Sequence, residues 1–240
     1  MKKLVLGSLL LAALATGCII TSSDDSGDLA TINAQWSFHT VNQKGDLSPP
    51  NNCPSGYGTV TLHSQEIDAS GRAIGPEFQD VFDCIDMQHL SAELEPGVYR
   101  SFLEVTAGRG GSLYADTIPA EVDVTVSDKT YTAQIVDNGG YFKAAWDLRN
   151  AQTSAPVGCS GLGGVEISAT ITGSATSIFD TYNCTDGFAI TDPLIEGTYL
   201  VQVTALNSAD QKIVTKDIPT QTIRDRNEVT DLGMVQLALP

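Results

Sequence analysis

Apolar and polar residues alternate in single steps along much of this 240-residue chain. In the first such run, Ile32, Ala34, Trp36 and Phe38 are separated by single polar residues. A period of two sends successive side chains to opposite faces, so each run predicts a β-strand with one buried face. Clusters of Gly, Pro, Asp and Ser separate the runs, and no helical pattern of useful length appears. The clearest runs are 32–38, 142–148, 165–171 and 199–205.

The landmarks of the first half recur in the second half in the same order. The stretch DVFDCID, which ends at Asp86, matches DTYNCTD, which ends at Asp186. Trp36 corresponds to Trp146, since each lies in the first strand of its copy. Recurrence of whole sets of landmarks at a fixed order is the signature of an internal repeat.

Turn residues at 136–140 interrupt two alternating runs and mark the boundary between the copies. The sequence therefore predicts an all-β fold of two tandem antiparallel β-sandwiches, with domain 1 at 30–138 and domain 2 at 139–240. We expect both tryptophans to lie in the sandwich cores. Each half has a complete set of strands, so we also expect the halves to fold separately.

A short stretch in each copy resembles a known family. Residues Leu94–Tyr99 read L-x-P-G-x-Y, and Ile195–Tyr199 is the second version, with Glu196 where the first has proline. This motif is similar to prealbumin-like, or carboxypeptidase regulatory-like, domains of secreted bacterial proteins. The resemblance implies an Ig-like sandwich of seven strands that serves as a spacer or binding module without catalysis. A true immunoglobulin domain would place the tryptophan between its two cysteines, whereas here the tryptophan precedes both.

The N-terminus carries an export signal. Lys2 and Lys3 precede an apolar run at 4–15 that is too short to span a bilayer. The sequence ATGC, Ala15–Cys18, resembles the lipobox of bacterial lipoproteins. The resemblance implies that residues 1–17 are a signal peptide and that Cys18 carries the lipid anchor. An ordinary secretory signal with an incidental cysteine is the alternative.

The residues after Cys18 suggest where the chain resides. Position 19 is Ile and not the Asp that favours inner-membrane retention, which points to the outer membrane, facing the periplasm or the cell surface. Residues 18–29 are small, polar and acidic, so they predict a flexible tether.

The net charge excludes one class of partner. The formal charge is −16, and it becomes −18 once Lys2 and Lys3 leave with the signal peptide. Nucleic-acid binding requires clustered Lys and Arg to neutralise phosphates, so we expect no nucleic acid. The same acidity disfavours a charge-driven peripheral contact with a membrane.

Four cysteines remain after Cys18, and they allow three pairings. The midpoint of Cys53 and Cys84 falls in the turn-like stretch 68–71, and the midpoint of Cys159 and Cys184 lies beside 172–176. Positions equidistant from a hairpin turn lie opposite each other, so we predict disulfides Cys53–Cys84 and Cys159–Cys184 at the open ends of two hairpins. The alternative, thiols that bind metal or act as a redox pair, lacks Cys-x-x-Cys spacing.

Candidates for catalysis are few. The histidines, His39, His63 and His89, are isolated in sequence, and we expect surface or loop positions for them. Ser160 lacks the flanking glycines of a nucleophile elbow. We therefore expect no enzyme activity and no cofactor.

Acidic positions near the second cysteine of each copy suggest weak calcium binding. Carboxylate and amide oxygens are the ligands that Ca²⁺ requires, but residues three apart on a strand point to opposite faces. The alternative is solvated acids in turns and at sheet edges. The residues are Asp80, Asp83 and Asp86, with Asp180, Asn183 and Asp186 as their counterparts.

The sequence as a whole predicts a non-enzymatic outer-membrane or surface lipoprotein. Its role would be structural, adhesive or protein-binding, with protein or glycan partners at the cell surface. The alternative is a carbohydrate- or small-ligand-binding lipoprotein that assists a transporter or a polysaccharide enzyme. Two or three exposed aromatic rings in one cleft would favour the alternative. The candidate rings are Tyr57, Tyr114, Tyr131 and Tyr141.

Overall fold

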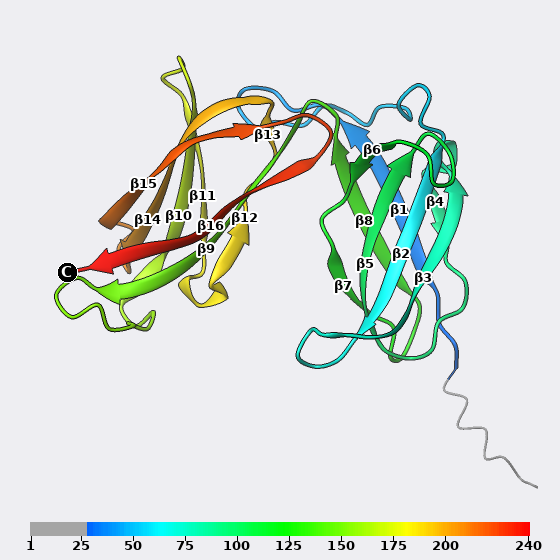
Figure 1. Ribbon diagram of the computed structural model, residues 1–240, viewed down its shortest axis with the longest axis horizontal. Helices are drawn as coiled ribbons and strands as arrows, with labels where there is room; N and C mark the ends of the chain where they lie inside the picture. The colour runs from blue at the N-terminus through cyan, green and yellow to red at the C-terminus, as the bar shows by residue number, and fades with distance from the viewer. Residues whose placement is uncertain (1–27) are drawn as a thin grey trace, which may run out of the picture.

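The computed structural model describes residues 28–240. The predicted signal peptide, Cys18 and all but the last two residues of the predicted tether lie outside the described residues. Within the described part, the chain is almost entirely strand, with two single 3-10 turns. None of its helical segments is long and apolar enough to cross a membrane. Figure 1 shows two lobes, one built from β1–β8 and the other from β9–β16.

The N-terminal sandwich comprises β1–β8 and one 3-10 turn. Its elements are β1 (Ile32–His39), β2 (Thr59–Ile67), β3 (Ala73–Asp83), η1 (Cys84–Asp86), β4 (Gln88–Leu90), β5 (Val98–Thr106), β6 (Leu113–Asp116), β7 (Ala120–Asp123) and β8 (Lys129–Val136). One sheet has the order β4-β1-β8. The other has the order β3-β2-β5-β6, with β7 also paired to β5.

The C-terminal sandwich comprises β9–β16 and repeats this plan. Its elements are β9 (Gly139–Asn150), β10 (Leu162–Ile171), β11 (Ser177–Tyr182), η2 (Cys184–Asp186), β12 (Phe188–Ile190), β13 (Leu194–Ile195), β14 (Gly197–Asn207), β15 (Lys212–Ile223) and β16 (Glu228–Leu239). Strands β12, β13 and β16 pair with β9 in one sheet, and the other has the order β11-β10-β14-β15.

The pairings are antiparallel except at one place in each sandwich. The first strand of each copy runs parallel to the last, as β1 with β8 and β9 with β16. The parallel pair brings the two ends of each copy together in one sheet. An all-β fold of two sandwiches was predicted from the alternation, and the structure confirms it.

Each sandwich has its own apolar core between its two sheets. The first core includes Trp36, and the second includes Trp146, which are 3% and 6% exposed. The tyrosine of the L-x-P-G-x-Y stretch, Tyr99, and its counterpart in the second copy, Tyr199, are also buried in their cores. Each tyrosine hydroxyl donates a hydrogen bond to a carbonyl oxygen four residues earlier, which fixes the start of the strand.

The disulfides join Cys53 to Cys84 and Cys159 to Cys184, the pairs that the cysteine spacing predicts. In the first copy, β2 and β3 form the hairpin, with Thr59 opposite Asp83 at its open end. The cysteines lie just beyond that end, so the disulfide closes the hairpin. Strands β10 and β11 form the corresponding hairpin in the second copy, and the Cys159–Cys184 disulfide lies beyond its open end.

The two sandwiches meet in a third apolar cluster, which we call the junction cluster. Val41, Val136 and Tyr141 are buried there, with partly buried side chains from both sandwiches around them. Because the cluster draws residues from both copies, part of the apolar burial depends on the contact between them.

Two asparagines add hydrogen bonds at the junction: Asn138, in the connector between β8 and β9, bonds to the first sandwich, and Asn227 bonds across to it from the second. The Asn138 amide both accepts from the backbone N–H of Val41, at 2.8 Å, and donates to its carbonyl oxygen, at 3.0 Å. The Asn227 side chain accepts from the N–H of Val136 and donates to the carbonyl oxygen of Asp116, each at 2.9 Å. Asn227 is 2% exposed, so these bonds are shielded from water.

Candidate functional site

The acidic residues proposed to bind calcium do not come together in one site. Asp80 and Asp180 each accept a hydrogen bond from a backbone N–H, of Ala92 and Asp192, which ties a loop to the hairpin strand. Asp83 and Asn183 precede the 3-10 turns without capping them, and Asp86 and Asp186 lie within the turns. Among residues 28–240, no group of three or more His, Cys, Asp or Glu side chains is placed to hold a metal ion.

The prediction of surface or loop positions was wrong for two histidines. His63 is 9% exposed because it stacks on Phe102, with ring centroids 4.4 Å apart, and its Nδ1 contacts Glu77 at 2.8 Å. His39 is 6% exposed, and both of its ring nitrogens have hydrogen-bond partners. His89 is exposed, as expected.

The four candidate tyrosines do not form an aromatic platform. Tyr131 and Tyr141 line one cavity of about 300 Å³, but they are only 6% and 8% exposed and so present no flat ring to a ligand. Tyr57 and Tyr114 pack on each other at 4.8 Å. These four tyrosines therefore do not place two or three exposed rings in one cleft, the arrangement that would favour a carbohydrate site.

A large hollow lies between the two sandwiches. We call this cavity of about 1070 Å³ the inter-sandwich groove. The N-terminal sandwich contributes Arg100 on β5 and residues 113–119 on and after β6. The C-terminal sandwich contributes Lys143, Phe188, Ile190 and the region 224–229. Neither sandwich alone forms this site, so its shape depends on the junction.

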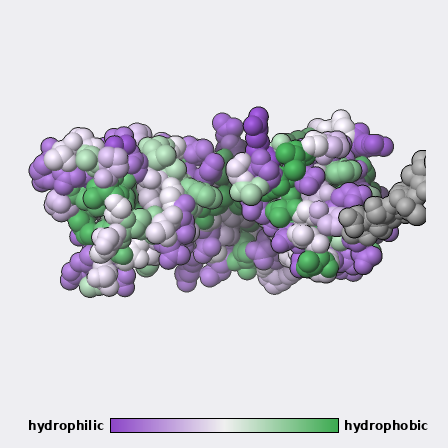
Figure 2. All heavy atoms as spheres, turned by 90° about the horizontal axis from the view of Figure 1, so that it is seen from below, coloured by the Kyte–Doolittle hydropathy of each residue, from purple (hydrophilic) through white to green (hydrophobic). Residues whose placement is uncertain are grey.

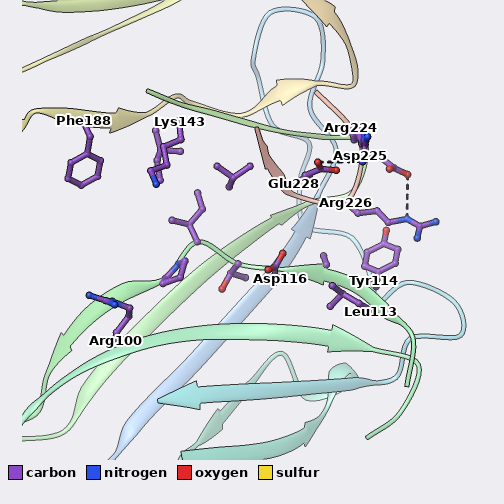
Figure 3. A pocket seen from close by; sticks show the side chains of 16 residues that line it. Arg100, Leu113, Tyr114, Asp116, Lys143, Phe188, Arg224, Asp225, Arg226 and Glu228 are labelled. Atoms are coloured by element: carbon purple, nitrogen blue, oxygen red, sulfur yellow. Dashed lines mark ion pairs between the residues drawn. The ribbon is translucent and has the colours of Figure 1, made fainter. Parts of the chain in front are cut away.

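Basic side chains lie at both ends of the groove. Figure 3 shows Arg100 and Lys143 toward one end, and Arg224 and Arg226 toward the other. These are four of the 13 Lys and Arg residues in a chain of net charge −16. Three carboxylates, of Asp116, Asp225 and Glu228, also line the groove, so its lining has a small positive excess within an acidic protein.

Three cations of the groove form ion pairs that are open to solvent, and one of them, Arg226, lies 3.4 Å from Asp225 with 47% of its side chain exposed. Arg224 lies 3.8 Å from Glu228, and its side chain is 73% exposed. Lys143 lies 3.5 Å from Asp231, with 43% of its side chain exposed. Exposed pairs at such distances contribute little to stability, so these cations are available to an incoming anion.

One tyrosine anchors the arginine-rich end of the groove. The Tyr114 hydroxyl donates a 3.0 Å hydrogen bond to the Asp137 carboxylate, and the Arg226 guanidinium lies 5.3 Å above the Tyr114 ring. Burial and the nearby Asp137 charge raise the pKa of Tyr114, so it stays a neutral donor. Burial also raises the pKa of Asp137.

Of the groove residues, only Tyr114 was identified from the sequence, as a candidate aromatic ring. Lys143 and Arg224 lie in different strands or loops, and no motif links them in sequence. The sequence shows that basic residues are few, but which of them lie close together depends on how the two sandwiches pack.

Comparisons with known proteins show only distant similarity. The sequence matches no described protein family and no curated protein. A leucine-rich repeat protein from Bacteroides thetaiotaomicron matches at 14% identity and a TM-score of 0.38, over 88% of this chain. This chain spans only 26% of that protein.

A minor pilin and a fimbrial anchor protein are also similar to this chain. The minor pilin GBS52 of Streptococcus agalactiae has 10% identity and a TM-score of 0.33, over 88% of this chain and 96% of its own. The fimbrial anchor protein Mfa2 of Porphyromonas gingivalis has 11% identity and a TM-score of 0.30, over 79% and 82%. Similarity at this level transfers no partner or activity to this chain.

Proposed function

We propose that this chain is a non-enzymatic, lipid-anchored protein of the outer membrane or cell surface, with a structural, adhesive or protein-binding role. The observation that carries the proposal is the closed junction between the sandwiches. The junction cluster around Val41, Val136 and Tyr141, together with the Asn138 and Asn227 hydrogen bonds, makes the two sandwiches one extended unit. Such a unit suits holding a binding surface away from a membrane.

The internal chemistry of the described residues supports a structural role. The buried tyrosines Tyr99 and Tyr199 bond to backbone carbonyls, and Asp80 and Asp180 hold loops. These polar groups are committed to the fold. The short resemblance of Leu94–Tyr99 to prealbumin-like domains agrees with a spacer or binding module.

The lipid anchor is a separate part of the proposal. It rests on the resemblance of Ala15–Cys18 to a lipobox and on the absence of Asp at position 19. Cys18 would carry the lipid, and residues 18–29 would separate the first sandwich from the membrane surface.

Cell fractionation tests the anchor. In a Gram-negative host, the wild-type chain is expected in the outer-membrane fraction, and Cys18→Ser is expected in the soluble fraction. Cys18→Ser that stays with membranes as the wild type does would refute lipid anchoring. Processing to a mature chain that begins at residue 18 can be checked by mass spectrometry.

Chemical cross-linking on intact cells tests the binding role. Wild-type protein is expected to form defined cross-links to at least one other envelope or surface protein. If it forms cross-links to no other protein at any spacer length, the protein-binding form of the proposal is wrong.

A further inference from the structure

We infer that the inter-sandwich groove binds an extended acidic peptide segment of a protein partner. This inference rests on the proposed protein-binding role and deepens it by naming the ligand class. Three observations support it: the basic side chains of the groove, its apolar walls and the edge strands that border it.

Charge is the first argument. Arg100, Lys143, Arg224 and Arg226 come from β5, β9 and the loop before β16, and the fold brings them to one hollow. The same hollow is lined by the carboxylates of Asp116, Asp225 and Glu228. Figure 3 shows Asp225 and Glu228 toward the end that holds Arg224, away from Arg100 and Lys143.

The end with Arg100 and Lys143 is therefore the more positive one. Arg100 donates to the carbonyl oxygen of Gly71 at 2.7 Å, which fixes its direction without neutralising it. Lys143 has only a distant partner, Asp231 at 3.5 Å. A ligand carboxylate at this end would gain a charge-assisted hydrogen bond.

The walls favour a peptide over a sugar. Leu113 and Phe188 are 51% and 55% exposed, and both line the groove with Ile118, Pro119 and Val229. Apolar walls of this kind suit apolar peptide side chains. The two aromatic rings of the lining, Phe188 and Tyr114, lie toward opposite ends of the groove in Figure 3, so they do not form one flat platform for a sugar. Figure 2, which views the molecule from below, shows green apolar patches on a largely polar surface.

Two strand edges border the groove and suit an extended backbone. Strand β6, which supplies Leu113 and Asp116, is the last strand of its sheet and pairs with β5. Strand β12, which supplies Phe188 and Ile190, is likewise at the edge beside β9. Edge strands present backbone N–H and C=O groups, which recognise an extended peptide by strand addition.

The contacts between the two sandwiches lower the conformational entropy that is lost when a ligand binds. Since the Asn227 side chain joins the loop before β16 to Val136 and Asp116 of the other sandwich before a ligand arrives, little ordering of the two walls is required on association. The ligand class is therefore a peptide with alternating acidic and apolar residues.

Fluorescence anisotropy on purified residues 28–240 tests the inference. The probe is a labelled ten-residue peptide of alternating Glu and Leu. A second peptide, with Lys in place of each Glu, is the charge control. Polygalacturonate is the competitor. We expect the acidic peptide to bind, salt to weaken it, and Lys143→Glu and Arg224→Glu each to weaken it at least about fivefold. Lys216→Glu makes the same charge change on an exposed position outside the groove and should have little effect.

Several outcomes would overturn the inference. These are no binding of the acidic peptide, equal binding of the Lys peptide, equal weakening by Lys216→Glu, or tighter binding of polygalacturonate than of the peptide. Thermal melting of each variant verifies that it is folded. A negative result here leaves the fractionation and cross-linking results unaffected, so it is distinct from failure of the proposed function.

Discussion

The indole Nε1 of Trp36 donates a 2.9 Å hydrogen bond to the carbonyl oxygen of Cys84. Trp146 and Cys184 repeat the same bond at 2.9 Å in the second sandwich. Because Cys84 is also joined to Cys53, this contact ties the sheet of β1 to the disulfide-closed hairpin of the opposite sheet.

Trp36→Phe keeps a large ring in the core but removes the donor. The Cys84 carbonyl oxygen then keeps only the 3.3 Å hydrogen bond from the Met87 N–H, so we expect a loss of about 1 kcal/mol in the free energy of unfolding. Trp146→Phe should cause a similar loss in the second sandwich. Urea denaturation measures both, and an unchanged midpoint in either variant would mean that the bond contributes nothing there.

Removal of one disulfide should destabilise the sandwich that contains it. The double variant Cys53→Ser/Cys84→Ser opens a loop with a sequence separation of 31, and Cys159→Ser/Cys184→Ser opens one of 25. Chain-entropy bookkeeping gives a loss of about 3.5 kcal/mol for each. Non-reducing peptide mapping of the exported wild type should recover both cross-links, and a 53–159 link would contradict the fold.

Asn227→Gly should weaken the junction. Asn227 has φ of 64°, which glycine adopts without strain, so this variant removes the side-chain bonds to Val136 and Asp116 and leaves the backbone conformation permitted. We expect a loss of about 2 kcal/mol, from two buried hydrogen bonds. Asp210→Gly, at φ of 55° in an exposed turn, is the matched control and should be close to neutral. Equal effects of the two changes would mean that backbone freedom alone explains the loss.

Asp137→Asn should change how stability depends on pH. Burial raises the pKa of the Asp137 carboxyl in the folded chain, and the hydrogen bond from Tyr114 and the charge of His39 oppose this. The folded chain thus binds the proton more tightly than the unfolded chain, and the stability contribution of this group falls as pH rises through the folded-state pKa. The variant should therefore gain stability relative to wild type as pH rises above about 4, the unfolded-state value, and through the raised folded-state pKa of Asp137.

Asp123→Asn provides a control with the opposite sign. Hydrogen bonds from Thr125 lower the pKa of Asp123, so wild-type stability from this group is lost as pH falls through that pKa. This variant should lose stability relative to wild type as pH rises. Denaturation at several pH values measures both differences, and a pH-independent difference for Asp137→Asn would contradict the assignment.

The strands and disulfides could be predicted because local rules determine them. Alternation identifies the buried face around Trp36, and the turn chemistry at 68–71 sets the hairpin that Cys53 and Cys84 close. The internal repeat then supplies the second copy. His63 was misplaced because the outer face of β2 is itself covered by Phe102, and periodicity does not report packing on that face.

The junction and the groove could not be predicted from the sequence. Asn138 meets Val41 across 97 positions, and Asn227 meets Val136 across 91. These are single polar residues in loops, with no period or spacing that distinguishes them from other turn residues. Their role appears only once the two sandwiches are placed against each other.

The central claim, that the two sandwiches form one rigid unit, can be tested by a spin-label distance measurement. Labels at Gln79→Cys on β3 and Thr181→Cys on β11 occupy exposed strand positions in the two sandwiches. The closed junction predicts a single narrow distance distribution that broadens in Asn138→Ala/Asn227→Gly. A broad or multiple distribution in the chain with both asparagines intact would contradict the claim.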